Sequence, residues 1–220
     1  MTKREKRHQK IRPPAADSLR ADWRLFIAVP MSESVHAFVA SLIDDLSTAD
    51  LPIRWTDPET AHLTLHFLGD TARERAELLR LGLTAPIAEH QSFELHTADL
   101  GVFPNPRQPR VVWLGLGGDV GRLERLAHAV GRTLQQLGFP VELGRFHPHI
   151  TLGRVREHPP PDLPDALDRA LRTTSTSLAA TTVQVNEVLL VRGFLGKGGA
   201  RHEPIARYPL RVRGDNDNLA

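Results

Sequence analysis

The residues best suited to chemistry in this sequence are two histidines that stand in the same four-residue pattern. The pattern reads His62-Leu-Thr-Leu65 in the first half of the chain and His149-Ile-Thr-Leu152 in the second. In a β-strand, residues i and i+2 point to one face. Each histidine therefore shares a face with a threonine, Thr64 or Thr151, while the aliphatic residues of the pattern point to the opposite face and into a core.

Two such His/Thr pairs that face each other across a cleft suit displacement at phosphorus. Histidine titrates at a pKa of about 6.5, so it exchanges protons at neutral pH. One imidazole can take the proton of an attacking oxygen while the other protonates a departing oxygen, and each transfer is worth about 10²–10⁴-fold in rate. The threonine hydroxyls can donate to the non-bridging phosphate oxygens. Chemistry of this kind requires no metal ion.

A metal site is the main alternative use of these histidines. By strand alternation, His66 lies on the face of His62, and His147 lies on the face of His149. Four histidines would suit zinc or nickel. Neither motif contains a carboxylate, however, and threonine is a poor ligand. We therefore expect no metal and no cofactor, with His66 and His147 lining or supporting the cleft.

The two motifs belong to an internal repeat. In the first half, residues 25–29 read as a strand, residues 35–46 as an amphipathic helix after a Ser32 N-cap, and residues 53–55 and 62–67 as strands. The second half repeats this order at residues 111–116, 123–137, 141–143 and 149–152. The apolar positions of the second helix follow those of the first by 88 residues, and His149 follows His62 by 87. Each half continues with a helix and a strand, at residues 71–83 and 93–102 and at residues 163–172 and 183–191.

This order predicts an α+β fold of two lobes related by a pseudo-twofold axis, with antiparallel sheets flanked by helices around a central cleft. A last strand at residues 206–212 closes the chain. The expected domain covers residues 23–214, with halves at residues 23–105 and 106–214 and a tail at residues 215–220. The glycine-rich residues 193–199 read as a loop, and they lack the spacing of a Walker phosphate-binding motif.

Composition excludes several other classes of protein. The chain has 220 residues, 25% of them charged, and no cysteine, so disulfides, thiolate metal sites and a cysteine nucleophile are excluded. It contains no apolar run of about 20 residues and no secretory signal at its start. We therefore expect a cytoplasmic monomer that does not bind a membrane.

The basic residues are concentrated at the start of the chain. Residues 1–22 contain seven Lys and Arg against three Asp and Glu, and they read as a disordered arm. Such an arm could attract RNA in a salt-dependent way. An ordinary solvated terminus explains the same residues equally well.

The motifs and their surroundings resemble the two-histidine (2H) phosphoesterases, and among them the bacterial and archaeal RNA 2′,3′-cyclic phosphodiesterases, also called 2′-5′ RNA ligases. The resemblance runs from about Arg24 to Tyr208. It includes Arg24-Leu-Phe-Ile-Ala-Val-Pro30, His62-Leu-Thr-Leu-His-Phe-Leu-Gly69, Phe103-Pro-Asn-Pro-Arg107, Val112-Trp-Leu-Gly115 and Phe146-His-Pro-His-Ile-Thr-Leu-Gly-Arg154. The chain departs from the family at Arg192-Gly193, where a serine is usual.

The resemblance implies a role for each motif residue. His62 would protonate the leaving 3′ oxygen and His149 would activate water, so that a terminal ribose 2′,3′-cyclic phosphate opens to a 2′-phosphate. Thr64 and Thr151 would hold phosphate oxygens. Arg154 is a phosphate contact if its strand bends after Leu152, and otherwise a structural ion pair. Three aromatic residues could stack on a base or belong to the core: Phe146, Phe194 and Tyr208.

Other functions share these residues. If an RNA 5′-hydroxyl replaces water, the reverse reaction forms a 2′-5′ linkage. The chain could also be a phosphodiesterase of 2′-5′ oligonucleotides or sugar nucleotides, or an RNA-binding module without catalysis. A matched acid/base pair argues against simple binding. The symmetry of the motifs leaves the assignment of acid and base to the family resemblance.

Overall fold

The computed structural model of the protein describes residues 22–141, 146–176, 179–196 and 199–212. The elements in chain order are β1 (Trp23–Pro30), α1 (Glu33–Ser47), β2 (Ile53–Trp55), the 3-10 helix η2 (Pro58–Thr60), β3 (His62–Thr71), α2 (Arg73–Gly82), α3 (Thr84–Ala88), β4 (Phe93–Phe103), β5 (Val111–Gly118), α4 (Val120–Gln136), β6 (His149–Val155), α5 (Leu163–Ser175), β7 (Thr182–Val185), β8 (Glu187–Gly196) and β9 (Gly199–Pro209). The expected tail 215–220 and most of the expected arm and of the expected strand 141–143 lie outside the described residues.

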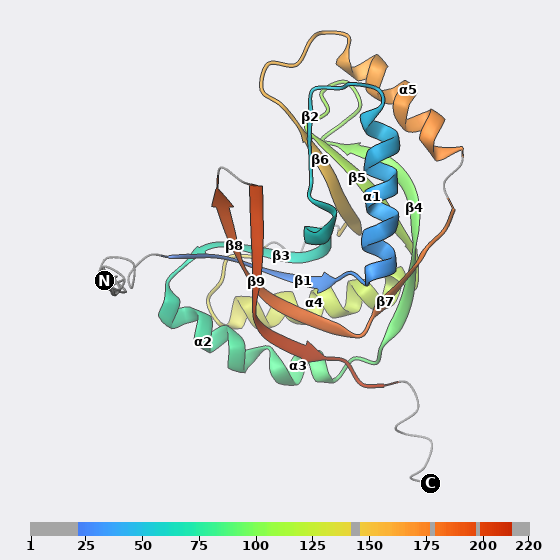
Figure 1. Ribbon diagram of the computed structural model, residues 1–220. Coiled ribbons are helices and arrows are strands. Elements are labelled where there is room, and N and C mark those ends of the chain that lie inside the picture. The colour runs from blue at the N-terminus through green and yellow to red at the C-terminus, as the bar shows by residue number, and fades with distance from the viewer. Residues whose placement is uncertain (1–21, 142–145, 177–178, 197–198, 213–220) are drawn as a thin grey trace, which may run out of the picture.

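The strands form one curled antiparallel sheet in the order β7-β4-β5-β6-β3-β1-β8-β9, and β2 pairs with β6 beside this path (Figure 1). The α+β class, the antiparallel pairing and the flanking helices predicted from the sequence are confirmed. We call β3, β1, β8 and β9 the first lobe, and β7, β4, β5 and β6 with β2 the second lobe. The lobes meet where β3 pairs with β6.

Each lobe takes strands from both halves of the sequence. Strand β4 comes from the first half and pairs with β5 and β7 of the second. Strand β8 comes from the second half and pairs with β1 of the first. A lobe is therefore not one copy of the repeat, and neither half can complete its sheet alone.

The helices form where the apolar periodicity predicts them. The Ser32 hydroxyl accepts a hydrogen bond from the Val35 N–H (3.4 Å) and caps α1. Helix α1 buries a stripe at Val35, Val39, Leu42, Ile43 and Leu46, and α4 buries the matching stripe at Leu123, Leu126, Ala127, Val130 and Leu134. Figure 1 shows α1 and α5 beside the strands of the second lobe, with α2, α3 and α4 along the first. No helix among the described residues is long and apolar enough to cross a bilayer.

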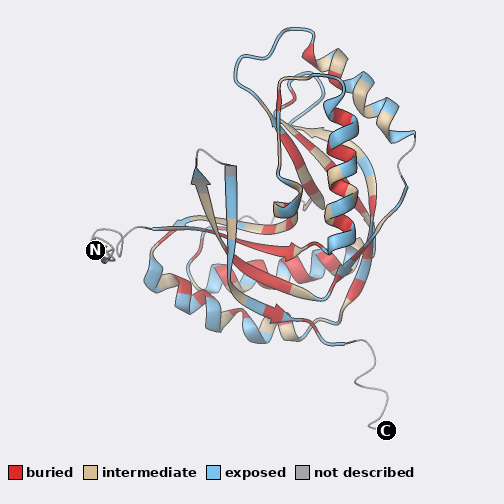
Figure 2. Ribbon diagram, in the orientation of Figure 1, coloured by how far each residue is buried: buried red, intermediate tan, exposed pale blue. Residues whose placement is uncertain are grey.

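Two hydrophobic clusters lie on opposite faces of β1. The large core includes Leu25, Ile27 and Val29 together with the apolar stripes of the helices. A small cluster on the other face contains Phe26, Ala28, Leu189 and Val191. Figure 2 shows the buried residues concentrated along the strands and on the helix faces turned to them. Strand β1 is thus buried on both faces from Leu25 to Val29, which fits the apolar sequence of that stretch.

Two sequence predictions for the C-terminal part are wrong. The expected strand 183–191 is divided into β7 and β8 at Asn186, whose carbonyl accepts a hydrogen bond from the Leu210 N–H (2.8 Å). The expected loop 193–199 is largely the end of a hairpin, in which β8 pairs with β9 out to Gly196 opposite Gly199. The backbone ladder overrides the weak strand propensity of glycine here, and it brings His202 into β9.

Candidate active site

The two His/Thr motifs lie side by side where the lobes meet. Strands β3 and β6 pair at one position, Leu63 opposite Ile150, and both of these side chains are fully buried in the core. The residues before and after each of them point to the other face. The structure therefore brings His62, Thr64 and their second-half counterparts together on one face of the sheet, which we call the histidine face.

A backbone carbonyl fixes the ring of His62. Its Nδ1–H donates to the carbonyl oxygen of Thr60, two residues earlier (2.8 Å). This bond requires the proton on Nδ1 and leaves Nε2 free for chemistry. The ring of Phe26 stacks on the imidazole at 4.9 Å, and the ring of His202 meets it edge-on at 4.9 Å. Burial, together with the charges of His202 and His149, lowers the pKa of His62 to about 4, although the bond to Thr60 opposes this shift.

The ring of His149 is held in the same way. Its Nδ1–H donates to the carbonyl oxygen of His147, again two residues earlier (2.7 Å). Burial lowers the pKa of His149, the backbone bond raises it, and the charges of His147 and Arg154 lower it. Phe103 meets this ring edge-on at 5.0 Å. Both imidazoles are therefore oriented and mainly neutral at pH 7, and within the described ranges neither Nε2 has a hydrogen-bond partner.

The threonines supply two unused hydroxyl groups. Thr64 lies opposite Ala28 of β1, and Thr151 lies opposite Trp113 of β5. Both are partly exposed. Within the described residues neither hydroxyl has a hydrogen-bond partner. Each can donate to an oxygen of a phosphate bound between the histidines.

A β-bulge follows each motif at the same place. In β3 the register with β1 skips Leu65, and in β6 the register with β5 skips Leu152. One extra residue reverses the alternation of all residues after it. In β6 the bulge turns Arg154 to the histidine face, because Arg154 lies opposite Val111, and Val111 lies opposite Phe103. The bend on which the prediction for Arg154 depends is therefore present, and Arg154 stays a candidate phosphate contact.

The same bulge makes the predicted face of His66 wrong. His66 does not share the face of His62, because the bulge at Leu65 turns it toward α4. Its Nε2–H donates to the carbonyl oxygen of Ala127 in that helix (2.8 Å). Burial lowers the pKa of His66. His66 ties α4 to the sheet and does not line the site.

The remaining predicted residues divide between the site and the core. The exposed ring of His147 lies 5.4 Å from that of Trp113 and 5.5 Å from that of Phe103, beside His149. Phe146 packs against the large core. The ring of Phe194 lies under two guanidinium groups, those of Arg192 at 4.4 Å and Arg201 at 4.2 Å.

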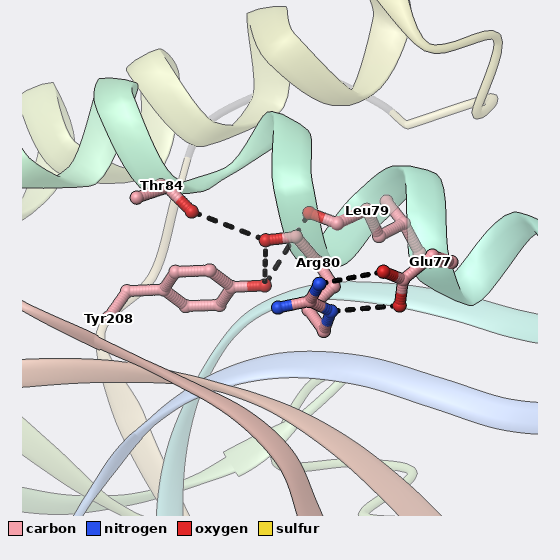
Figure 3. A network of polar contacts seen from close by, with 5 residues as sticks. All are labelled: Glu77, Leu79, Arg80, Thr84 and Tyr208. Atoms are coloured by element: carbon pink, nitrogen blue, oxygen red, sulfur yellow. Dashed lines mark hydrogen bonds and ion pairs between the residues drawn. The ribbon is translucent and has the colours of Figure 1, made fainter.

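The prediction that Tyr208 stacks on a base is wrong. Its side chain is only 3% exposed. Figure 3 shows its hydroxyl directed at α2, where it donates to the carbonyl oxygens of Leu79 (3.4 Å) and Arg80 (3.3 Å). Burial raises the pKa of Tyr208 to about 12. Tyr208 lies opposite the fully buried Val188 and shares its core face.

Sequence reasoning missed four rings that surround the histidines. Phe26 and His202 border His62, and Phe103 and Trp113 border His149. The indole of Trp113 lies flat on the sheet because two neighbouring positions are glycines, Gly101 and Gly115, where a Cβ would meet the ring. The repeat could have pointed to Phe26 and Trp113, since each lies on the strand that pairs with a motif. Nothing local could have pointed to His202.

No group of three or more His, Cys, Asp and Glu side chains within the described ranges is arranged to hold a metal ion. The site thus consists of two oriented imidazoles, two hydroxyls and one guanidinium, enclosed by aromatic rings. This arrangement can move two protons around a bound phosphate and stabilise its charge.

Comparison with known proteins gives consistent matches over most of the chain. A sequence model of the 2′-5′ RNA ligase superfamily matches residues 33–193. The RNA 2′,3′-cyclic phosphodiesterase of Aeropyrum pernix is 33% identical over 161 residues, which cover 73% of this chain and 88% of that protein. The one of Archaeoglobus fulgidus is 36% identical over 137 residues, 62% of this chain and 75% of that protein. Among solved structures, TT0787 of Thermus thermophilus matches with a TM-score of 0.67 at 26% identity, covering 86% of this chain and 99% of the other.

Proposed function

This chain belongs to the 2′-5′ RNA ligase superfamily, and from that membership we propose that it is an RNA 2′,3′-cyclic phosphodiesterase. It opens the cyclic phosphate at an RNA end to a 2′-phosphomonoester and a 3′-hydroxyl. One observation carries the proposal beyond family membership. Two imidazoles on adjacent strands each donate from Nδ1 to the carbonyl two residues earlier, so two free Nε2 atoms lie on one face.

We assign His149 as the base and His62 as the acid. The Nε2 of His149 takes a proton from water as the water oxygen bonds to phosphorus. The bond from phosphorus to the 3′ oxygen then breaks, and His62 gives its Nε2 proton to that oxygen. His149 ends protonated and His62 neutral, and exchange with solvent restores the starting state.

The low pKa of His62 fits this role once the substrate is bound. In the free enzyme its ring is mainly neutral, because it is buried and close to two other imidazoles. A cyclic phosphodiester carries one negative charge, and a negative charge nearby raises the pKa of an imidazole. The substrate itself therefore favours the protonated acid.

The other residues of the histidine face bind the phosphate. Thr64 and Thr151 donate their hydroxyls to its non-bridging oxygens, and Arg154 supplies positive charge beside His149. His147 borders the same site through its ring and holds His149 through its carbonyl. These partners stabilise the extra charge of the transition state.

The test is incubation of the full-length protein with a nucleoside 2′,3′-cyclic phosphate in the presence of EDTA. The products are separated from 2′- and 3′-phosphate standards. The proposal predicts the 2′-phosphate alone, at the same rate with and without EDTA. The 3′-phosphate as product would contradict the assigned leaving group, and loss of activity in EDTA would contradict the two-histidine mechanism.

The setting of the reaction is also part of the proposal. We propose that the protein acts as a monomer on RNA ends in the cytoplasm. Its lack of cysteine fits a reducing compartment. Light scattering during size exclusion tests the monomer, which requires a mass near 24.5 kDa.

A further inference from the structure

A row of four residues crosses the second lobe beside His149. Phe103, Val111, Arg154 and Arg54 lie opposite one another on strands β4, β5, β6 and β2. Directly opposed residues of antiparallel strands share a face. The ring of Phe103 contacts that of His149, so the row belongs to the histidine face. Two guanidinium groups thus lie on the site's own face.

Strand β6 leads from this row to a groove at the end of the lobe. Arg156 lies two residues beyond Arg154, and its N–H donates to the carbonyl of Pro52 (2.8 Å). The groove has a volume of about 700 Å³. Its lining includes three arginines, Arg107, Arg110 and Arg156, together with Glu157 and a run of prolines. Arg156 thus lines the groove just past the end of the strand that carries Arg154.

The arginines of the row and the groove differ in their ion pairing from other arginines of the chain. Elsewhere in the chain, arginines form ion pairs, such as Arg172 with Asp168 and Arg207 with Glu187. In the part of the chain that the structure describes, no ion pair involves the five at the row and the groove: Arg54, Arg107, Arg110, Arg154 and Arg156. All five are exposed. Unpaired like charges at one end of a lobe repel each other, and an anion would relieve that repulsion.

A nucleic acid strand fits this pattern better than a single phosphate. Guanidinium groups recognise phosphate oxygens through two parallel N–H bonds. Residues two apart in a strand advance by about 6.6 Å, so the arginines are spread along a path and do not converge on one point. A basic groove that follows a backbone is the usual design for binding single strands.

We propose that Arg54 and the arginines of the groove bind phosphates of the RNA on the 5′ side of the terminal cyclic phosphate, which makes an oligonucleotide the preferred substrate. This inference rests on the proposed function, because the terminal cyclic phosphate must lie between the two histidines. The strand leaves the active site past Arg154 and Arg54 and continues along β6 into the groove.

The test compares two substrates with two double variants. The substrates are a short RNA that ends in a 2′,3′-cyclic phosphate and the matching nucleoside 2′,3′-cyclic phosphate. The variants are Arg107→Gln/Arg156→Gln in the groove and Arg125→Gln/Arg132→Gln on α4, both pairs being exposed. Helix α4 packs on the face opposite the histidines, so the second variant is a control for loss of charge. Circular dichroism checks that each protein is folded.

We expect the groove variant to lower the ratio of kcat/KM for the RNA to kcat/KM for the nucleoside by about tenfold. This is the size of effect expected from the loss of two exposed charge pairs. The slope of log kcat/KM against log salt for the RNA should fall by about 1.4, because each single-strand phosphate contact contributes about 0.7. The α4 variant should leave both quantities as in the wild type.

Three results would overturn the inference. The first is a groove variant that retains the wild-type ratio between RNA and nucleoside, and the second is an α4 variant that changes this ratio as much. The third is an equal salt slope for RNA and nucleoside in the wild-type enzyme, which would contradict a bound strand. Failure of the wild-type enzyme to open either substrate would instead overturn the proposed function, so the two failures are distinguishable.

Discussion

In the first half of the chain His62 is stacked on Phe26 and touched by His202, whereas in the second half His149 lies beside Phe103 and Arg154. The backbone around the two rings is nevertheless the same. Each Nδ1–H donates to the carbonyl two residues earlier, and each strand bulges at the last leucine of its motif. The repeat has thus retained the backbone that aims the imidazoles and changed the side chains that tune them.

The position after each bulge shows the difference most clearly. Counting from the motif, Phe67 in β3 corresponds to Arg154 in β6, and Phe67 lies on the histidine face with its ring 6.1 Å from that of Phe26. Phe67 is 64% exposed. An aromatic ring thus occupies the position that carries a guanidinium in the other half. In the proposed mechanism, the guanidinium of the second half would bind the phosphate, and the first half would supply the buried acid His62.

Removing either imidazole should have the largest effect on activity, and it tests whether both halves are needed for catalysis. His62→Ala and His149→Ala should each lower kcat about 10³-fold, within the usual range for one proton transfer. Thermal unfolding of both variants should stay close to that of the wild type. Activity within tenfold of the wild type in either folded variant would show that one half is sufficient.

The unequal burial of the two rings predicts a pH effect on stability. The pKa of His62 is about 4 in the folded protein against 6.5 for an unperturbed histidine, the value expected in the unfolded chain. Because the folded pKa is lowered, its contribution is fully present above about pH 6.5 and is lost as the pH falls toward 4. The difference is equivalent to about 3 kcal/mol.

Urea unfolding of the wild type and of His62→Asn at pH 7 and pH 4 measures this contribution of His62 to the free energy of unfolding. The wild type should lose about 3 kcal/mol more than the variant between the two values, since every other titrating group is common to both. Parallel losses in the two proteins would show that the ring of His62 is not desolvated.

Replacing the residue that follows each bulge, one at a time, is the next test of the difference between the halves. Arg154→Gln should lower kcat/KM for a nucleoside 2′,3′-cyclic phosphate about tenfold to hundredfold, because it removes a charged partner of the phosphate. Phe67→Leu, at the corresponding position, should change it less than about threefold, since no charge is lost. Equal effects would mean that the two positions do not differ in function.

The smallest expected effect concerns His66. His66→Gln removes the ring nitrogen that donates to Ala127, so the free energy of unfolding should fall by about 1 kcal/mol. The kcat should remain that of the wild type, because the side chain lies on the core side of β3. A fall in kcat with unchanged stability would place His66 in the site after all.

The sequence was sufficient for most elements before β7 and for the motif residues, since apolar periodicity and a repeat are local signals. Ser32, the stripe of α1 and the shared face of His62 and Thr64 were all predictable. The bulges were not, because they depend on the pairing of β3 with β1 and of β6 with β5. For that reason the placement of His66 was wrong, and that of Arg154 remained conditional.

Contacts between segments that are distant in the chain could not be predicted from the sequence either. The exchange of β4 and β8 between the lobes follows from strand order, which the local pattern does not determine. The same exchange brings the β8–β9 hairpin, and with it His202, against His62. From the sequence alone, Tyr208 could be free to stack on a base, because its contact with α2 depends on the tertiary fold. These errors come from tertiary contacts, either strand pairing or helix packing, that local patterns do not encode.

The most direct test of the central claim, that His62 is the acid and His149 the base, changes the leaving group. A nucleoside 2′,3′-cyclic phosphate with sulfur in place of the bridging 3′ oxygen releases a thiolate, whose pKa of about 8.5 makes protonation much less necessary. With this substrate His62→Ala should recover activity to within about tenfold of the wild type, while His149→Ala should remain inactive because water still needs a base. Rescue of His149→Ala instead of His62→Ala would contradict the assignment, and rescue of neither would contradict acid catalysis at the 3′ position.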